Sequence, residues 1–204
     1  LWDTKTWELV QVFRGHERYP YAVVFHPDGK RLASFDLMGV IKEWEISSAK
    51  TTRQWEATFM WGFDKKFRAD MGGARDMRFS PDGKYLAVAG LCEVTNAFAG
   101  THKPMVLLMN WDSGKFEKKL QIDSRGMAWG VRFHPDGFLV ASGAPSGVLW
   151  FWKLDGPDTN PKPFHTFKLS GGGRAIDLSP DGKQAAVAQI DRKVQLVQFT
   201  APQT

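Results

Sequence analysis

The residues that could perform catalysis or hold a metal are few and widely separated in this chain of 204 residues. The single cysteine, Cys92, adjoins Glu93, and the sequence indicates no partner base that would activate its thiol, so a small buried or half-buried thiol is expected. His102 and His165 lie in different segments, without a companion at the spacing of a metal site. The sequence therefore predicts no catalytic residue, no metal site and no cofactor.

A glycine-rich segment, SGGGRA at residues 170–175, invites comparison with a phosphate-binding loop. It lacks the Lys-Ser/Thr ending and the following helix that such loops require. We therefore interpret it as a tight turn that leads into a strand.

The best candidate for molecular recognition is the stretch MWGFDKKFRADMG, residues 60–72. It mixes three aromatic and three basic side chains, namely Trp61, Phe63, Lys65, Lys66, Phe67 and Arg68. Aromatic side chains beside cations suit an interface anchor or contacts with an anionic partner. The alternative is that the aromatic side chains fold down as a lid on the protein while the lysines face water.

A pentapeptide that occurs four times indicates the elements that position these residues. It occurs as FHPDG at 25–29 and 133–137, FSPDG at 79–83 and LSPDG at 178–182. Proline presets the first corner of a β-turn, aspartate hydrogen-bonds the backbone ahead of it, and glycine supplies the positive φ. The aspartate–glycine pairs with this structural role are Asp28–Gly29, Asp82–Gly83, Asp136–Gly137 and Asp181–Gly182. Apolar runs flank each copy, so each copy predicts a hairpin.

Two copies of the pentapeptide contain a histidine. His26 and His134 stand where the other copies have Ser80 and Ser179, and we interpret them as turn residues.

A longer period surrounds each hairpin. Trp44, Trp152 and Val197 each lie seventeen residues after the turn proline, whereas Trp111 lies thirty residues after Pro81. A further strand is expected after each of the three tryptophans, at about 53–58, 116–122 and 163–169, and another at residues 8–13 after Trp2. Four strands in about 41–54 residues match the period of propeller blades.

The phrases RGH at 14–16, FHPDGKRLAS at 25–34 and LWD at 1–3 together resemble the WD-repeat β-propeller family. The resemblance covers nearly the whole chain and implies an all-β fold of about four blades, each a four-stranded antiparallel sheet. It implies that His16 caps an inner strand, that Trp44, Trp111 and Trp152 pack between blades, and that Arg174 faces a central channel. At the place of the family's histidine the later repeats have Asp70, Ser124 and Leu169, and Met38 and Ser146 replace its aspartate. The family's His–Ser–Asp–Trp hydrogen-bond network is therefore predicted to be incomplete in every blade.

The repeat divides the chain into a single partial propeller. We expect the end of a preceding blade at 1–13, blades at 14–58, 59–122 and 123–169, a final blade without its outer strand at 170–200, and a tail at 201–204. This arrangement predicts the C-terminal part of a larger propeller. A closed four-bladed ring is the weaker alternative.

Two insertions interrupt the repeat in the same predicted blade, at 60–72 and 91–104. In the family both connections emerge on one face, and binding residues commonly lie in loops built out from a rigid scaffold. We therefore predict a binding surface from the six residues of the first insert together with His102 and Lys103 of the second. A long hairpin extension packed on the first insert explains the second equally well.

Composition leaves three functions to compare. The chain is 43% apolar and 24% charged, no run approaches the ~18 apolar residues of a membrane span, and a formal charge of +5 comes from scattered lysines and arginines. The leading hypothesis is a non-catalytic scaffold that binds a protein or an adjacent domain of the same polypeptide. An enzyme is less favoured because no acid, base or metal set repeats around the channel. Binding of nucleic acid or another anionic polymer is possible but not favoured.

Overall fold

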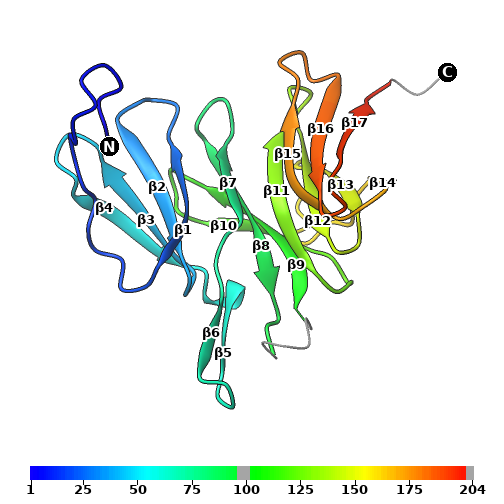
Figure 1. Ribbon diagram of the computed structural model, residues 1–204, viewed down its shortest axis with the longest axis horizontal. Helices are drawn as coiled ribbons and strands as arrows, with labels where there is room; N and C mark the ends of the chain where they lie inside the picture. Colours follow the sequence, from blue (N-terminus) through cyan, green and yellow to red (C-terminus); the bar gives the residue numbers. More distant parts are fainter. Residues whose placement is uncertain (96–101, 201–204) are drawn as a thin grey trace.

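The computed structural model describes residues 1–95 and 102–200, and this part of the chain is built from β-strands with one short 3-10 turn at Thr58–Met60. The strands form four antiparallel sheets arranged side by side, plus a separate two-stranded hairpin (Figure 1). The predicted all-β fold of antiparallel sheets is confirmed: three sheets have four strands, and the fourth has three, as expected for a sheet without its outer strand.

Strand order within each sheet follows the chain. The first sheet contains β1 (Pro20–Phe25), β2 (Arg31–Asp36), β3 (Val40–Glu45) and β4 (Thr51–Glu56). The second contains β7 (Asp76–Phe79), β8 (Tyr85–Cys92), β9 (Lys103–Asn110) and β10 (Phe116–Gln121). The third contains β11 (Met127–Phe133), β12 (Phe138–Ala144), β13 (Val148–Lys153) and β14 (His165–Lys168). The fourth contains β15 (Gly173–Leu178), β16 (Gln184–Gln189) and β17 (Val194–Gln198), and the hairpin contains β5 (Trp61–Asp64) and β6 (Ala69–Gly72).

The sheets pack face to face through three apolar cores. The first strands of neighbouring sheets touch, β1 with β7, β7 with β11, and β11 with β15, so these four strands form the inner edge of the row. Trp111 fills the core between the first and second sheets, and Trp152 fills the core between the second and third. Burial of such large side chains is the main stabilising contribution to stacked sheets.

The repeated pentapeptide forms the predicted turns. Gly29, Gly83, Gly137 and Gly182 all have positive φ between 68° and 83°. In the serine copies the hydroxyls of Ser80 and Ser179 donate to Asp82 and Asp181, which also accept backbone N–H groups two residues further on. Each turn is thus closed by its own side chains.

The two pentapeptides that contain histidine also contact neighbouring sheets. The Nε2 atom of His26 lies 3.1 Å from the carbonyl oxygen of Gly83, and that of His134 lies 2.8 Å from the carbonyl oxygen of Gly182. Each Nδ1 accepts the N–H group of the aspartate two residues ahead. A neutral imidazole protonated on Nε2 satisfies both contacts. The two histidines therefore connect the first sheet to the second and the third to the fourth.

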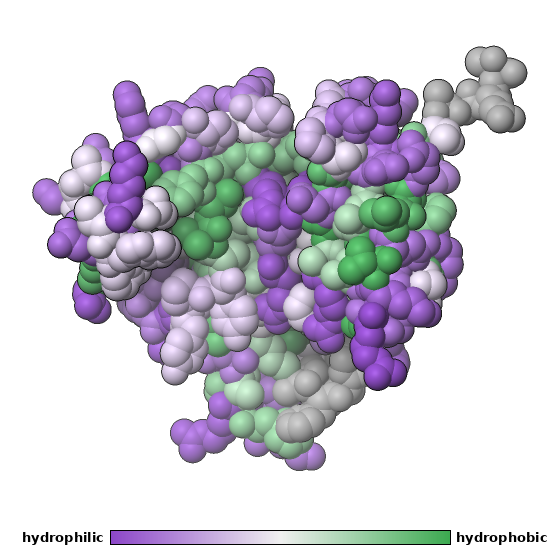
Figure 2. Space-filling view, turned by 45° about the horizontal axis from the view of Figure 1, so that its top comes forward, coloured by the Kyte–Doolittle hydropathy of each residue, from purple (hydrophilic) through white to green (hydrophobic). Residues whose placement is uncertain are grey.

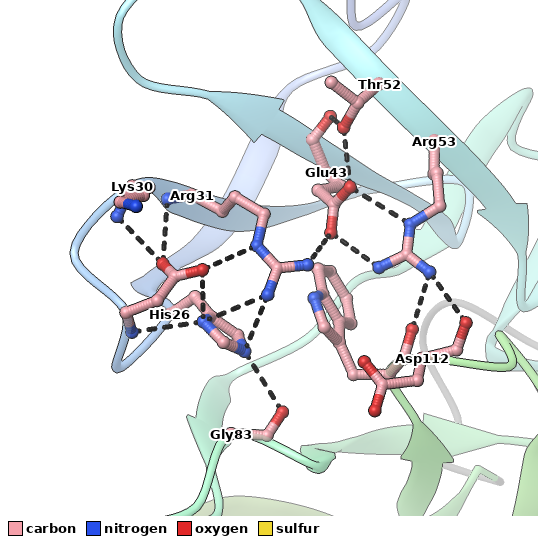
Figure 3. Close-up of polar contacts among 10 residues, drawn as sticks. His26, Lys30, Arg31, Glu43, Thr52, Arg53, Gly83 and Asp112 are labelled. Atoms are coloured by element: carbon pink, nitrogen blue, oxygen red, sulfur yellow. Dashed lines mark hydrogen bonds and ion pairs between the residues drawn. The ribbon is translucent and has the colours of Figure 1, made fainter.

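A buried carboxylate of the first sheet holds an arginine that hydrogen-bonds to the second sheet (Figure 3). Glu43 on β3 accepts bonds from Arg31 at 3.1 Å, from Arg53 at 3.0 and 2.6 Å, and from Thr52 at 2.6 Å. The Arg53 guanidinium also donates to the carbonyl oxygens of Trp111 and Asp112 in the second sheet. It also lies beside the rings of Trp55 and Trp111, 4.8 and 5.2 Å from their centroids, and the two rings contact each other.

One expectation about the family's hydrogen-bond network is wrong for the first sheet. His16 Nε2 lies 2.6 Å from the hydroxyl of Ser34, His16 Nδ1 lies 2.9 Å from Asp36, and Trp44 donates to Ser34 at 2.7 Å. The carboxylate comes from Asp36 at the end of β2 rather than from position 38, because Asp36 also accepts the N–H groups of Met38 and Val40 and so caps the turn. The four-residue network is complete there.

The third sheet has only part of the same network, because its histidine and aspartate are replaced. Ser124, Ser142 and Trp152 occupy the places of His16, Ser34 and Trp44, and Ala144 occupies that of Asp36. The hydroxyls of Ser124 and Ser142 and the indole N–H of Trp152 are buried and have no hydrogen-bond partner among the described residues. The prediction of an incomplete network therefore holds in this sheet.

This contrast predicts different responses of two tryptophans to one substitution. Trp44→Phe should lower the free energy of unfolding by about 1–3 kcal/mol more than Trp152→Phe, because it leaves Ser34 without its buried donor, whereas Trp152→Phe removes an N–H group that has no partner among the described residues. Both side chains are nearly fully buried, so the variants are matched in volume lost. Urea denaturation of each variant measures the difference, and equal losses would contradict the assigned roles.

At the two ends of the row the arrangement departs from the expected strands. Residues 8–13 do not form the expected strand, and they contribute only an isolated bridge between Trp2 and Leu9. Within the described residues β17 pairs with β16 alone. Val23 and Phe25 on β1 and Val194 and Leu196 on β17 are exposed, and Figure 2 shows apolar areas on two sides of a hydrophilic strip. The blade boundaries and the larger ring stay predictions.

Candidate functional site

The first insert folds as a hairpin that projects from the row of sheets (Figure 1). Strands β5 and β6 pair from Trp61–Gly72 to Asp64–Ala69. Asp64 accepts the N–H groups of Lys66 and Phe67, and the indole of Trp61 donates to Asp70 at 3.0 Å. These local bonds hold the tip, residues 65–68, in a defined turn without glycine.

The tip and the adjoining end of β5 present both aromatic and basic side chains to solvent. Phe63 is 48% exposed and Phe67 is 46% exposed. Lys65, Lys66 and Arg68 are exposed beside them, while Trp61 is partly buried. The lid alternative, in which all three aromatic side chains are buried, is therefore wrong.

The second insert lengthens the hairpin of β8 and β9, which stay paired as far as Cys92 and Lys103. It touches the first insert, since a Cβ atom at Gly62 would lie 2.7 Å from the carbonyl oxygen of Val94. Residues 96–101 of the second insert lie outside the described residues. The structure thus brings the two inserts together at one edge of the second sheet.

The two candidate residues of the second insert differ in what they can offer a partner. Lys103 is engaged within the chain, because its Nζ lies 3.0 Å from both Glu93 and Asp123. His102 is partly buried, and its pKa is lowered by burial and by the positive charge of Arg75. The accessible cations of the inserts are therefore those of the β5–β6 tip.

A second group of residues, which the sequence reasoning missed, lies along the inner edge. Six positions before each turn proline stand Tyr21, Arg75, Trp129 and Arg174; we call these four residues the inner row. The Arg75 guanidinium lies 5.1 Å from the Tyr21 ring centroid and 5.5 Å from that of Trp129, and the Arg174 guanidinium lies 4.1 Å from Trp129. Cations and aromatic rings alternate across the four sheets.

The inner row is produced by a shared irregularity of the backbone. The register shifts at Tyr21, Trp129 and Arg174, where one residue is skipped in pairing with the second strand of the sheet. Arg75 lies at the same place, because its N–H group donates to Ala89, the residue that also faces Asp76. Such bulges redirect a side chain out of the regular alternation. Aligning the four repeats on their prolines would have revealed the alternation of residue types.

The inner row adjoins the inserts. The side chain of Arg75 donates to the carbonyl oxygen of Gly72, the last residue of β6, at 3.1 Å. The N–H group of Gly126, just before β11, donates to the carbonyl oxygen of His102. The insert hairpins and the inner row therefore belong to one face of the molecule.

The described residues show little that could perform catalysis. Cys92 is buried, and burial together with the charge of Glu93 raises the pKa of its thiol to about 12, so it is a neutral thiol at neutral pH. No group of three histidine, cysteine or acidic residues suited to a metal ion occurs in the described part of the chain. Nor does that part contain a helix with the length and apolar character of a membrane span.

Comparison with known proteins finds a family match in one part of the chain. The sequence model of the family "WD domain, G-beta repeat" matches residues 7–44. That segment ends at Trp44 and contains the first sheet's complete network of His16, Ser34, Asp36 and Trp44. The match thus falls where the hydrogen-bond pattern is intact.

Two curated relatives and one solved structure are similar to the chain over most of its length. "WD repeat-containing protein SL1-17" of Schistosoma mansoni is 21% identical over 195 residues, which cover 96% of this chain and 56% of that protein. "Protein HIR1" of Gibberella zeae is 25% identical, over 89% of this chain and 18% of that protein. The solved "Structure of U3-55K" has a TM-score of 0.63 and 16% identity, and the match covers 92% of this chain and 54% of that one.

The chain thus spans about half of the length of two of these proteins and less than a fifth of the third. The likeness to U3-55K shows the fold, and the repeats, the four side-by-side sheets and the family match agree with it. Proteins built on this repeat commonly serve as scaffolds for other proteins, and the two curated relatives named above do not carry the name of an enzyme. The family match at residues 7–44, the two relatives and the shared fold together support a WD-repeat family for this chain.

Proposed function

We propose that this chain is a non-catalytic scaffold that holds a protein partner, or an adjacent domain of its own polypeptide, through the face that carries the two inserts. One observation carries the proposal: near the end of a projecting hairpin, Phe63 and Phe67 are about half exposed beside Lys65, Lys66 and Arg68. Exposed aromatic side chains on a defined turn are typical anchors of an interface.

The shape of the insert supports this role. Asp64 and Asp70 hold the hairpin through bonds to the tip backbone and to Trp61, so a partner would meet a turn that is already ordered. An ordered binding loop loses less conformational entropy on binding than a flexible one. The contact between Gly62 and Val94 further supports the hairpin from the second insert.

The two other candidate functions have weaker support. For an enzyme, the described groups are already engaged: the thiol of Cys92 is buried, and His26 and His134 bond to neighbouring turns. For an anionic polymer, the three tip cations form a small patch, and Lys103 is neutralised by Glu93 and Asp123. Binding of a polyanion would weaken steeply as salt is raised, whereas a protein interface would respond weakly.

A photo-crosslinking amino acid at position 63 tests the proposal. We expect a partner protein to be crosslinked from position 63, and the same amino acid at position 183, in a turn of the fourth sheet, to serve as the matched control. Phe63→Ser should then weaken binding of the captured partner at least about tenfold, as loss of an aromatic anchor does. It should change the free energy of unfolding by less than about 0.5 kcal/mol, because the side chain is exposed.

Two results would contradict the proposal. One is an unchanged affinity of the captured partner for Phe63→Ser. The other is a clear loss of stability in that variant, which would assign the side chain to packing of the hairpin instead.

A further inference from the structure

The two arginines of the inner row differ from the other arginines along the inner edge. Three positions closer to the turns, Arg78 pairs with Asp76 at 3.2 Å, and Arg132 pairs with Asp76 and, at 2.8 Å, with Asp177. The ion pairs of the described residues include none for Arg75 or Arg174. Carboxylates in this part of the chain thus balance the charges of Arg78 and Arg132, but not those of Arg75 and Arg174.

The two arginines without a carboxylate partner among the described residues lie on the same aromatic ring. Both guanidinium groups contact the ring of Trp129, and Arg75 also contacts Tyr21. The pKa of Arg75 is lowered by burial and by the positive charge of Arg174, although Tyr21 opposes this shift. Arg75 is held by the carbonyl oxygens of Gly72 and Gly73, while Arg174 is exposed. Two like charges are therefore fixed near each other by backbone and aromatic contacts, in an arrangement that an added anion would stabilise.

We propose that the inner row binds an acidic peptide segment, whose side-chain carboxylates pair with Arg75 and Arg174 while its apolar atoms pack on Tyr21 and Trp129. Arginine offers a planar set of donors that matches a carboxylate, and stacking on an aromatic ring leaves the edge of the guanidinium free for such bonds. The exposed ring of Tyr21 at the end of the row provides apolar surface beside the charges. This inference rests on the proposed scaffold function, because it specifies the chemistry of the protein that is held.

A peptide fits this surface better than a nucleic acid. Asp76 and Asp177 lie close to the inner row, where they pair with Arg78 and Arg132. The almost fully exposed Asp123 and the exposed Glu93 lie beside the second insert. A continuous phosphate backbone would meet these carboxylates after two favourable contacts. A peptide can place its acidic side chains at the two arginines and neutral residues elsewhere.

Fluorescence anisotropy with the full chain tests the inference. The probes are a fluorescein-labelled glutamate-rich peptide and the same peptide with every glutamate replaced by glutamine. We expect the glutamine peptide to bind at least about tenfold more weakly, and Arg174→Gln to weaken binding of the glutamate peptide by a similar factor. Lys183→Gln removes an exposed charge at a distant turn and should leave the affinity unchanged. Arg75→Gln provides a second variant, with its fold checked by circular dichroism.

Three results would overturn the inference: equal affinity for the two peptides, an unchanged affinity in Arg174→Gln, or tighter binding of a thymidine oligonucleotide that also depends on Arg174. Phe63→Ser separates this test from that of the scaffold function, because it should not alter binding of the glutamate peptide. If the partner is captured from position 63 while the glutamate peptide fails to bind, the inner-row inference alone is wrong.

Discussion

Replacing Trp152 with alanine is expected to lower the free energy of unfolding by about 3–5 kcal/mol, the range for emptying a large aromatic core site. Trp152 is 1% exposed and packs in the core between the second and third sheets, against side chains that include Leu139, Ala87 and Val106. The sheets are held by their paired strands, so they cannot collapse fully into the vacated volume. The midpoint of urea denaturation measures the loss.

A matched control is Trp7→Ala, which truncates a tryptophan that is 75% exposed. It should leave the denaturation midpoint almost unchanged, since little apolar surface is removed from a core. If Trp152→Ala unfolds at the midpoint of the unmodified chain, the assignment of this residue to the core between the sheets is wrong.

The fold could be predicted from the sequence because its signals are local. Proline, aspartate and glycine act within a single turn, and apolar alternation acts within a single strand, so each hairpin is specified by about fifteen neighbouring residues. The tryptophans seventeen residues after the prolines mark the third strands for the same reason. All of the resulting hairpins are present in the structure.

The errors concern features that depend on contacts between distant residues. Asp36 completes the first sheet's network because a carboxylate at the end of β2 reaches both His16 and the turn backbone, which the family's spacing did not indicate. The β5–β6 hairpin was missed because its turn uses Asp64 and a positive φ at Arg68 instead of glycine.

The candidate site was predictable in part. Composition and insertion length pointed to residues 60–72, and contact between the two inserts follows from their shared sheet. Exposure of Phe63 and pairing of Lys103 could not be read from residue types, because both depend on which neighbours fold over them. The inner row depends on bulges in separate strands and emerges only when the sheets are side by side.

Replacing Arg53 with alanine should cost about 3 kcal/mol of the free energy of unfolding. This value lies at the lower end of the range for breaking a buried ion pair, because Arg31 would still contact Glu43 and Arg53 is itself partly exposed. The variant leaves the buried Glu43 with fewer donors, and it removes the bonds that join the first sheet to Trp111 and Asp112 (Figure 3). The double variant Glu43→Leu with Arg53→Met should recover much of the loss, since it leaves no unpaired buried charge.

The dependence of this loss on pH identifies its cause. Burial alone would raise the pKa of Glu43, but hydrogen bonds from Arg53 and Thr52 and the charges of Arg53 and Arg31 outweigh burial, so the pKa is lowered. A carboxyl group whose pKa is lowered by folding stabilises the protein above its unfolded value of about 4.3, and this contribution disappears as pH falls through the folded value. Arg53→Ala removes part of the cause of the shift. The difference in stability between the unmodified chain and Arg53→Ala should therefore be largest near neutral pH and become smaller below about pH 4. A difference that stays constant from neutral to acidic pH would show that Arg53 acts through its packing on Trp55 and Trp111 rather than through the charge of Glu43.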